Sequence, residues 1–189
     1  MTGSAPQGRP RSETARLAVL HAVDDLLVEV GYAAMTMKGI AERAGVGRMT
    51  VYRWWPTKAH LLVEACAADI PKELTVPDVA DPVGQLTGFL TALTAFLTGS
   101  DAGAAYRALL GEAQHDPEVG KLVADADLLG GPAREVLARV RGKLDAVPED
   151  PFATAELCGP VVLLVMSGSP APDPAALRAH AVRLAKSWA

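Results

Sequence analysis

Asp-Pro pairs occur at four places in the chain and constrain its fold more than any other feature of the sequence. An aspartate side chain caps the N-terminus of a helix, and proline is tolerated at the first helical position because it has no N–H to leave unsatisfied. Each pair therefore predicts that a helix starts there. The pairs are Asp81-Pro82, Asp116-Pro117, Asp150-Pro151 and Asp173-Pro174.

Apolar residues recur at helical spacing through most of the chain. No segment shows sustained apolar and polar alternation, and the best strand candidate, 161–165, is too short to be told from a buried helix. We therefore expect an all-α fold of nine to ten helices. The expected helices cover about 12–30, 36–44, 47–54, 58–70, 83–99, 101–115, 118–129, 133–147, 152–168 and 175–188.

Secretion and membrane signals are weak. The first 13 residues contain no apolar stretch of the signal-peptide kind. The stretch 83–100 carries no charge, but Gln85 and four threonines make it a poor lipid-facing span. The two cysteines lie far apart, without a disulfide framework or a metal-ligand spacing. We expect a cytoplasmic protein with no membrane partner, no metal site and no cofactor.

Charge is distributed unevenly along the chain. Residues 1–60 hold eight basic and five acidic residues, a net charge of +3. Because the whole chain has a net charge of −4, residues 61–189 have a net charge of −7. Such an asymmetry is expected if one end of the chain contacts a polyanion, although three charges also arise by chance. Residues 1–11 read as a disordered basic arm.

The segment 32–62 has the pattern of two short helices joined by a tight turn. Thr36 is placed to cap the first helix, and Gly45 allows the left-handed turn between them. Val51 and Trp55 are expected to point into the core, with the rest of the second helix presented outward. This is the helix-turn-helix arrangement, whose second helix enters the major groove of DNA.

The side chains of this segment suit contacts with DNA. An arginine at the start of the second helix reaches the guanine edge in two places, and hydroxyl groups bond to phosphate oxygens. A lysine at the start of the next helix attracts phosphate together with the free backbone N–H groups. The candidate DNA-binding residues are Thr36, Lys38, Arg48, Thr50, Tyr52, Arg53 and Lys58.

The pattern T-x-x-x-I-A-x-x-A-G-V-x-x-x-x-V-Y-x-x-W-x-x-K-x-x-L, from Thr36 to Leu61, resembles the DNA-binding domain of the TetR family of bacterial regulators. The resemblance implies a helix-turn-helix domain over 12–57, with three helices, and a helical ligand-binding and dimerisation domain over 58–189. Two residues depart from the family's pattern. Gly47 stands where a capping Ser or Thr is common, and Trp55 replaces a Phe.

The body of the chain resembles the family only in length and helical content, and the resemblance implies a ligand pocket there. Leucines and threonines form adjacent stripes on the helix 83–99. Its hydroxyls either bond back to the carbonyl four residues earlier or face a cavity. The candidate ligand-binding residues are Phe89, Leu93, Phe96, Tyr106, Leu110 and Gln114, and the alternative is that they are plain core.

Helices 133–147 and 152–168 are the candidates for a homodimer interface, and the alternative places 152–168 at the centre of the core. The resemblance favours a repressor that binds a palindromic operator in double-stranded DNA and is released by an unidentified small molecule. An activator or a ligand-independent regulator is the alternative. A helical enzyme or interaction protein is a remoter one, because none of the nucleophile-elbow, P-loop, zinc-protease or dinucleotide motifs occurs.

Overall fold

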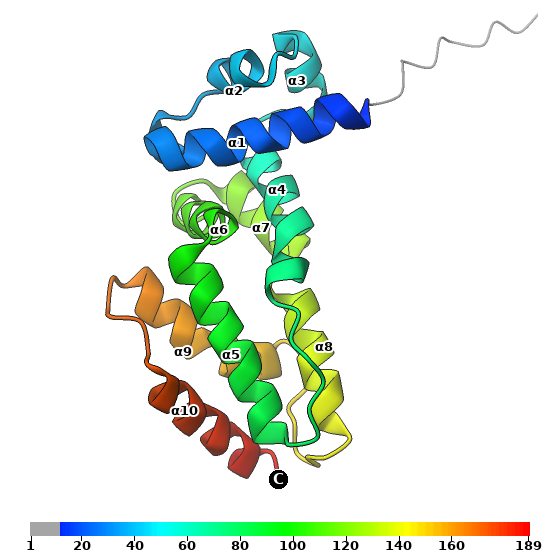
Figure 1. The fold of residues 1–189 in the computed structure, drawn as a ribbon, viewed down its shortest axis with the longest axis vertical. Helices are drawn as coiled ribbons and strands as arrows, with labels where there is room; N and C mark the ends of the chain where they lie inside the picture. The colour runs from blue at the N-terminus through cyan, green and yellow to red at the C-terminus, as the bar shows by residue number, and fades with distance from the viewer. Residues whose placement is uncertain (1–11) are drawn as a thin grey trace, which may run out of the picture. The chain divides into compact units, whose positions relative to one another are not determined.

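A computed structural model describes residues 12–189, so the predicted basic arm over 1–11 lies outside the described residues. Over 12–189 the chain forms ten α-helices and no strand, which confirms the all-α prediction (Figure 1). The strand candidate 161–165 lies inside a helix. The chain divides into two compact units, which we call the N-terminal unit (through Leu61) and the C-terminal unit (from Leu62). The division falls inside α4 (Lys58–Glu73).

The N-terminal unit is built from α1 (Glu13–Ala34), α2 (Met37–Ala44) and α3 (Arg48–Trp54), together with the start of α4. Ser12 caps α1 by accepting a hydrogen bond from the Ala15 N–H. The helical path of α1 is broken at Gly31, whose φ of 73° is left-handed, at the residue where the sequence predicts a stop. Helix α2 packs against α1 and α3.

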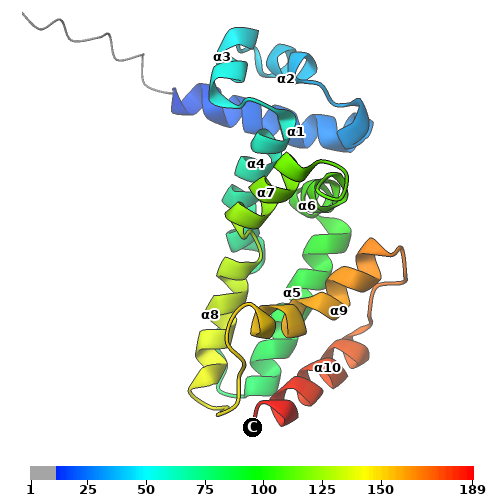
Figure 2. The same ribbon diagram turned by 180° about the vertical axis from the view of Figure 1, so that it is seen from behind.

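The C-terminal unit is organised around α5 (Pro82–Gly99), which contacts α6, α8, α9 and α10. Figure 2 shows α9 crossing α5 between α8 and α10. Because neighbours surround α5, its leucine and phenylalanine side chains are fully buried. The other helices are α6 (Asp101–Glu112), α7 (Pro117–Ala126), α8 (Gly130–Arg141), α9 (Phe152–Met166) and α10 (Pro174–Ser187).

Helices start at all four Asp-Pro pairs, and three of the four aspartates cap their helices. Asp81, Asp116 and Asp173 each accept hydrogen bonds from backbone N–H groups in the first turn of α5, α7 and α10. At the fourth pair α9 starts at Phe152, as predicted, but no side chain caps it. The Asp150-Pro151 peptide bond is cis. The Asp150 carboxylate instead accepts a hydrogen bond from the Thr154 hydroxyl at 3.3 Å.

Several helix boundaries differ from the predicted ones, most clearly in α4 and α8. Helix α4 continues through Pro71 to Glu73, where the sequence predicts an end before the proline. Helix α8 covers Gly130–Arg141 rather than 133–147, since Gly142 ends it and an irregular segment follows. Within that segment the Ala146 N–H donates to the Trp188 carbonyl near the C-terminus of the chain. No helix over residues 12–189 is long and apolar enough to cross a membrane.

Candidate functional site

The turn between α2 and α3 is fixed by the residues that the sequence singled out. The Thr36 hydroxyl accepts a hydrogen bond from the Gly39 N–H at 3.0 Å and so caps α2. Gly45 ends α2 in the left-handed conformation, with φ 63° and ψ 27°. Gly47 precedes α3 and supplies no side-chain cap, as expected for a glycine in that place. The result is a helix, a tight turn and a second short helix.

One side of α3 is anchored in the core of the N-terminal unit. Val51 is fully buried, and Trp55, directly after the helix, is 2% exposed. Both core predictions are therefore confirmed. Trp54 is half-buried, and its ring lies edge-on to that of Trp55, with 5.6 Å between the centroids. This anchoring fixes which face of α3 remains at the surface.

The outward face of α3 is mainly basic and polar. Arg48, Tyr52 and Arg53 are exposed, and Thr50 is half-buried. Among the residues that the structure describes, Arg48 and Arg53 form no ion pair. Their guanidinium groups therefore remain available to an outside partner. Met49, which is not among the residues predicted to bind DNA, is 82% exposed on the same short helix.

Arg43 is used differently from the arginines of α3. Its guanidinium forms hydrogen bonds of 2.9 Å and 2.5 Å with both carboxylate oxygens of Glu29 on α1, and it also pairs with Asp25 at 3.4 Å. These contacts raise the pKa of Arg43 and lower the pKa of Glu29. Arg43 therefore ties α2 to α1 and is already occupied within the unit.

The two lysines predicted to bind DNA make different contacts within the N-terminal unit. Lys38 lies 3.6 Å from Glu42 one turn along α2, and both side chains are largely exposed. Lys58, at the start of α4, donates a hydrogen bond of 2.9 Å to the Tyr32 carbonyl. Its ammonium also lies 3.9 Å from the centroid of the Tyr32 ring. An ammonium has three donors, so these contacts orient Lys58 without using all of its capacity.

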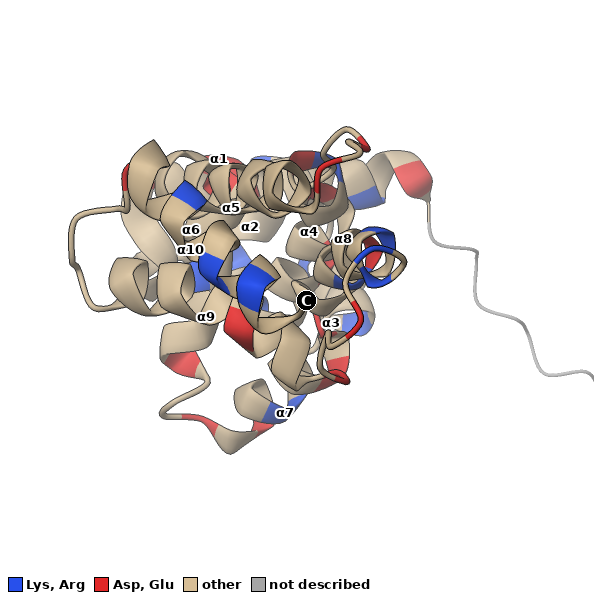
Figure 3. Ribbon diagram, turned by 90° about the horizontal axis from the view of Figure 1, so that it is seen from below, with Lys and Arg blue, Asp and Glu red and all other residues tan. Residues whose placement is uncertain are grey.

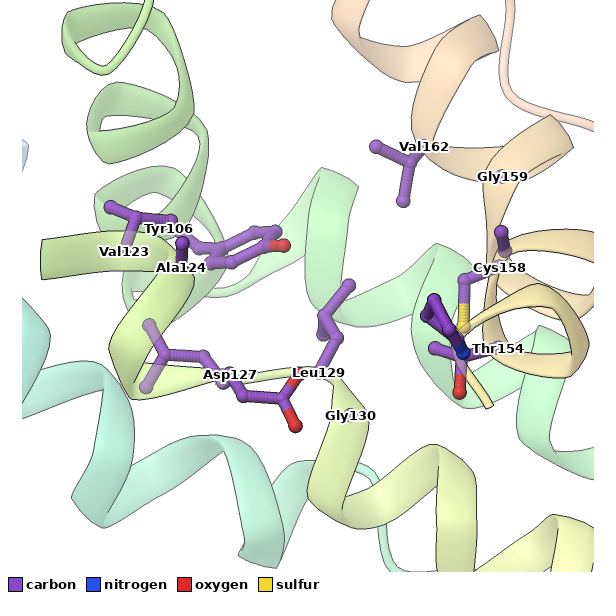
Figure 4. Close-up of a pocket in the computed structure, with 13 residues that line it drawn as sticks. Tyr106, Val123, Ala124, Asp127, Leu129, Gly130, Thr154, Cys158, Gly159 and Val162 are labelled. Atoms are coloured by element: carbon purple, nitrogen blue, oxygen red, sulfur yellow. The ribbon is translucent and has the colours of Figure 1, made fainter. Parts of the chain in front are cut away.

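The C-terminal unit contains a cavity of about 330 Å³ between α6, α7, α8 and α9 (Figure 4). A cavity of this volume lies at the lower end of the range for small-molecule sites. Its walls are mostly apolar. The lining residues are Tyr106, Val123, Ala124, Asp127, Leu128, Leu129, Gly130, Pro151, Thr154, Ala155, Cys158, Gly159 and Val162.

Of the six predicted ligand-binding residues, Tyr106 alone lines this cavity. Phe89, Leu93 and Phe96 are fully buried in the core around α5. The threonine hydroxyls of α5 each donate to the carbonyl four residues earlier at 2.6–2.8 Å, and none of these threonines lines this cavity. Leu110 is half-buried, and Gln114 is exposed with its amide donating to the Leu110 carbonyl at 3.4 Å.

Helix α9 presents an apolar surface to solvent. Phe152 is 71% exposed and Leu163 is 68% exposed, with Leu164 and Met166 beside Leu163 in the sequence. Figure 3 shows most of α9 without charged residues. Glu156 is its one charged residue, and the Glu156 carboxylate accepts a hydrogen bond from the Trp188 indole at 2.9 Å. This face is unusual for the surface of a protein that acts alone.

Comparison with known proteins decides the family. Residues 19–65 match the family model described as bacterial regulatory proteins, tetR family. The crystal structure of the TetR family transcription regulator SCO0332 superposes with a TM-score of 0.78 at 28% sequence identity, over 92% of this chain and 98% of that one. The chain contains the DNA-binding domain of the TetR family of transcriptional regulators. The matched segment contains α2, α3 and their turn, so the helix-turn-helix described above is the family's DNA-binding element.

Two curated TetR-type relatives match over shorter regions. The uncharacterized HTH-type transcriptional regulator YdeS of Bacillus subtilis is 37% identical over 113 residues, which cover 60% of this chain and 57% of YdeS. The HTH-type transcriptional repressor KstR of Rhodococcus jostii is 42% identical over 57 residues, 30% of this chain and 27% of KstR. The chain thus aligns with less than two thirds of the length of either relative.

Proposed function

We propose that this TetR family regulator is a repressor that binds a palindromic DNA operator as a homodimer and releases it when a small molecule occupies the C-terminal unit. The observation that carries the proposal is the outward face of α3. Two arginines without ion pairs in the described structure project from a helix that is anchored by Val51 and Trp55. A short, firmly held, basic helix is what the major groove accepts.

The residues of α3 divide by the kind of DNA contact that their chemistry allows. Arg48, at the start of the helix, suits the O6 and N7 acceptors of guanine. The hydroxyls of Thr50 and Tyr52 suit phosphate oxygens, which fix the register of the protein on the duplex. Met49 is apolar and 82% exposed, so its natural partner in the major groove is the methyl group of thymine.

The remaining candidates lie around α3 and suit the DNA backbone. Thr36 and Lys38 lie at the N-terminus of α2, where free N–H groups favour anions. Lys58 is oriented by Tyr32 at the start of α4. Arg53 is exposed in the last turn of α3. Together they supply positive charge without base specificity, so their contribution should fall with rising salt.

The exposed face of α9 supports the homodimer. Apolar residues there leave water when two copies meet across a two-fold axis, and α8 packs beside α9 and would complete a four-helix interface. A two-fold dimer presents two recognition helices to two half-sites one helical turn or a multiple of it apart. The operator should therefore be a near-palindrome.

Release by a small molecule requires that the two units be coupled. Helix α4 starts in the N-terminal unit and continues into the C-terminal unit, so it is the segment through which occupancy of the C-terminal unit would act. The effector must bind the DNA-incompetent state more tightly, with a coupling of about 1–3 kcal/mol. Such an effector weakens operator binding about 5- to 150-fold at saturation.

The test is DNase footprinting of the purified chain on the DNA upstream of its own gene, followed by selection from random sequences if no protection is seen. The Arg48→Ala, Arg53→Ala variant should lose protection. An Arg178→Ala, Arg183→Ala variant removes the same charge from exposed positions on α10 and should keep it. Absence of any selected sequence at low salt, or equal loss in both variants, would show that α3 is not the DNA-reading element.

A further inference from the structure

We infer that the cavity of the C-terminal unit binds a small, uncharged and mainly apolar molecule that accepts one hydrogen bond from the hydroxyl of Tyr106. The inference rests on the proposed function only in naming this molecule as the effector. The binding itself is a property of the C-terminal unit and can be measured without DNA.

The Tyr106 hydroxyl is the polar group that the cavity leaves without a partner. The Tyr106 side chain is buried, with 8% of the residue exposed, and its ring packs against Phe96 with centroids 6.0 Å apart. Within residues 12–189 no hydrogen bond is formed by its hydroxyl. Figure 4 shows the hydroxyl directed from α6 toward the side of the cavity formed by Cys158 and Val162. The ring is buried, but the hydroxyl is open to the cavity, where the acceptor of a bound molecule can reach it.

The size and the walls of the cavity define the rest of the molecule. A volume of about 330 Å³ is about twice that of an engineered cavity that binds benzene. Leu128 and Leu129 are buried at its wall, with Val123 and Val162 half-buried beside them. Apolar walls favour a ligand that is itself mostly apolar.

Charge argues against an ionic ligand. The one ionisable carboxylate among the lining residues is Asp127, and its Oδ2 is already paired with Arg134 at 2.5 Å. No lysine, arginine or histidine is among the described residues that line the cavity. An anion would meet no cation there, and a cation would have to compete with Arg134 for the carboxylate. Against these apolar walls an ion would lose part of its hydration without gaining an opposite charge, so the cavity favours a neutral molecule.

Burial keeps the two reactive groups of the wall in their neutral forms. Removal from water raises the pKa of Cys158 to about 12 and also raises the pKa of Tyr106. The thiolate is the nucleophilic form of cysteine, so Cys158 at neutral pH is an apolar wall and not a site of covalent capture. A neutral Tyr106 keeps the proton that it donates. Binding is therefore reversible, with Tyr106 as the donor.

Four single-ring probes of similar size test these requirements separately. Anisole is uncharged and has one acceptor, ethylbenzene is uncharged and has none, benzoate is an anion, and benzylammonium is a cation. Dissociation constants are measured by ligand-observed NMR titration of the full chain at pH 7, without DNA. Three variants are compared with the wild type. Tyr106→Phe removes only the hydroxyl, Tyr32→Phe makes the same change in the N-terminal unit, and Gly159→Leu fills the cavity.

The wild type should bind anisole about 2- to 10-fold more tightly than ethylbenzene, the ratio that one hydrogen bond supplies, and should bind neither ion. In Tyr106→Phe the ratio should fall to about one, with ethylbenzene affinity kept, and Tyr32→Phe should behave like the wild type. Gly159→Leu should abolish binding of both neutral probes. A Cβ at Gly159 meets no atom within 4 Å, so circular dichroism should show that this variant stays folded.

Several outcomes would overturn the inference. One is equal binding of anisole and ethylbenzene by the wild type, and another is an unchanged ratio of these two affinities in Tyr106→Phe. The others are binding of either ion as tightly as anisole, and binding of the neutral probes by a folded Gly159→Leu protein. Failure of all four probes to bind would also overturn it. None of these results depends on the footprinting experiment, so a wrong ligand class and a wrong DNA-binding role give different patterns of failure.

Discussion

Two arginines five positions apart have opposite roles. Arg43 is held by Glu29 and Asp25 of α1, and its contribution is to the packing of α2 on α1. Arg48 has no ion-pair partner in the described structure and projects from the first turn of α3. The difference follows from the turn at Gly45, which redirects the chain so that the two guanidinium groups no longer share surroundings. Substitution of each should therefore have a distinct effect.

The pair of Glu29 and Arg43 makes stability depend on pH. The pKa of Glu29 is lowered in the folded state, chiefly by its hydrogen bond from Arg43, so its stabilising effect is present above the ordinary glutamate pKa. That effect is lost as the pH falls through the lowered value. Wild type should be more stable than Glu29→Gln at pH 7, and the difference should shrink as the pH falls below the ordinary glutamate pKa of about 4 and vanish below the lowered pKa. Urea unfolding of both proteins across this range measures it.

The control for this prediction is Glu42→Gln. Glu42 lies on the same unit and is 3.6 Å from Lys38, but both side chains are largely exposed. Exposed pairs of this kind contribute little, so Glu42→Gln should leave the urea midpoint nearly unchanged at every pH. A loss for Glu42→Gln equal to that for Glu29→Gln would mean that general charge, and not the Arg43 contact, sets the pH dependence.

Met49 should read thymine. An apolar contact with one methyl group is worth about 0.8 kcal/mol, or roughly a fourfold change in affinity. Replacing single operator thymines by deoxyuridine, which lacks that methyl, should weaken wild-type binding by this factor at one position of each half-site. In Met49→Ala the same replacement should have no effect. If deoxyuridine has equal effects on both proteins, Met49 does not contact that methyl group.

At the scale of the element, the α2–α3 turn depends on the left-handed conformation of Gly45. A Cβ there would meet no atom within 4 Å, so the cost of a side chain is conformational and not steric contact with neighbours. Gly45→Ala should destabilise the chain by about 1–2 kcal/mol. Gly45→Asn should cost less, because asparagine tolerates this region better than alanine. Chemical denaturation of the two variants gives the comparison, and an Asn variant less stable than the Ala variant contradicts this explanation.

Helix α5 contains threonines whose hydroxyls are satisfied within the helix. Thr91 is exposed and donates to the Thr87 carbonyl at 2.8 Å, so its hydroxyl is satisfied within α5. Thr91→Ala should stabilise the chain by a few tenths of a kcal/mol, because alanine has the higher helix propensity. Leu93→Ala, two residues on in the buried face, should destabilise it by about 2–5 kcal/mol. Thermal unfolding of both variants measures the contrast, and a destabilised Thr91→Ala would indicate an unseen partner for the hydroxyl.

Elements were more predictable than the packing between them. Proline, glycine and capping residues act locally, so the sequence alone predicts nine to ten helices and the turn at Gly45. Asp150 does not cap α9, and its carboxylate accepts a hydrogen bond from the Thr154 hydroxyl instead. The predicted pocket residues Phe89, Leu93 and Phe96 fail to line the cavity because four helices pack on α5. Spacing within one helix does not show how many neighbours that helix has.

At the scale of the whole molecule, the exposed face of α9 should set the oligomeric state. Leu163 is 68% exposed, so Leu163→Glu should leave the fold of the single chain intact while placing a charge in the proposed interface. Burying that charge twice across the two-fold axis is costly, so the variant should be a monomer in size-exclusion chromatography with light scattering. The monomer should also lose protection of a palindromic operator.

Ala179→Glu is the matched control for the dimer prediction. It adds the same charge at an exposed position on α10, outside the apolar face of α9. This variant should remain a dimer. A dimeric Leu163→Glu protein, or a monomeric Ala179→Glu protein, would place the interface elsewhere on the molecule.

The burial of both cysteines makes the chain suitable for site-directed spectroscopy. Cys66 is fully enclosed and Cys158 is 4% exposed, so neither reacts readily with a labelling reagent near neutral pH. A cysteine introduced at exposed Arg53 would then be the one thiol that takes a spin label. In a homodimer, electron paramagnetic resonance would report the distance between the two labels directly. The separation of the recognition helices, with and without a molecule in the cavity, thus becomes a measurable length.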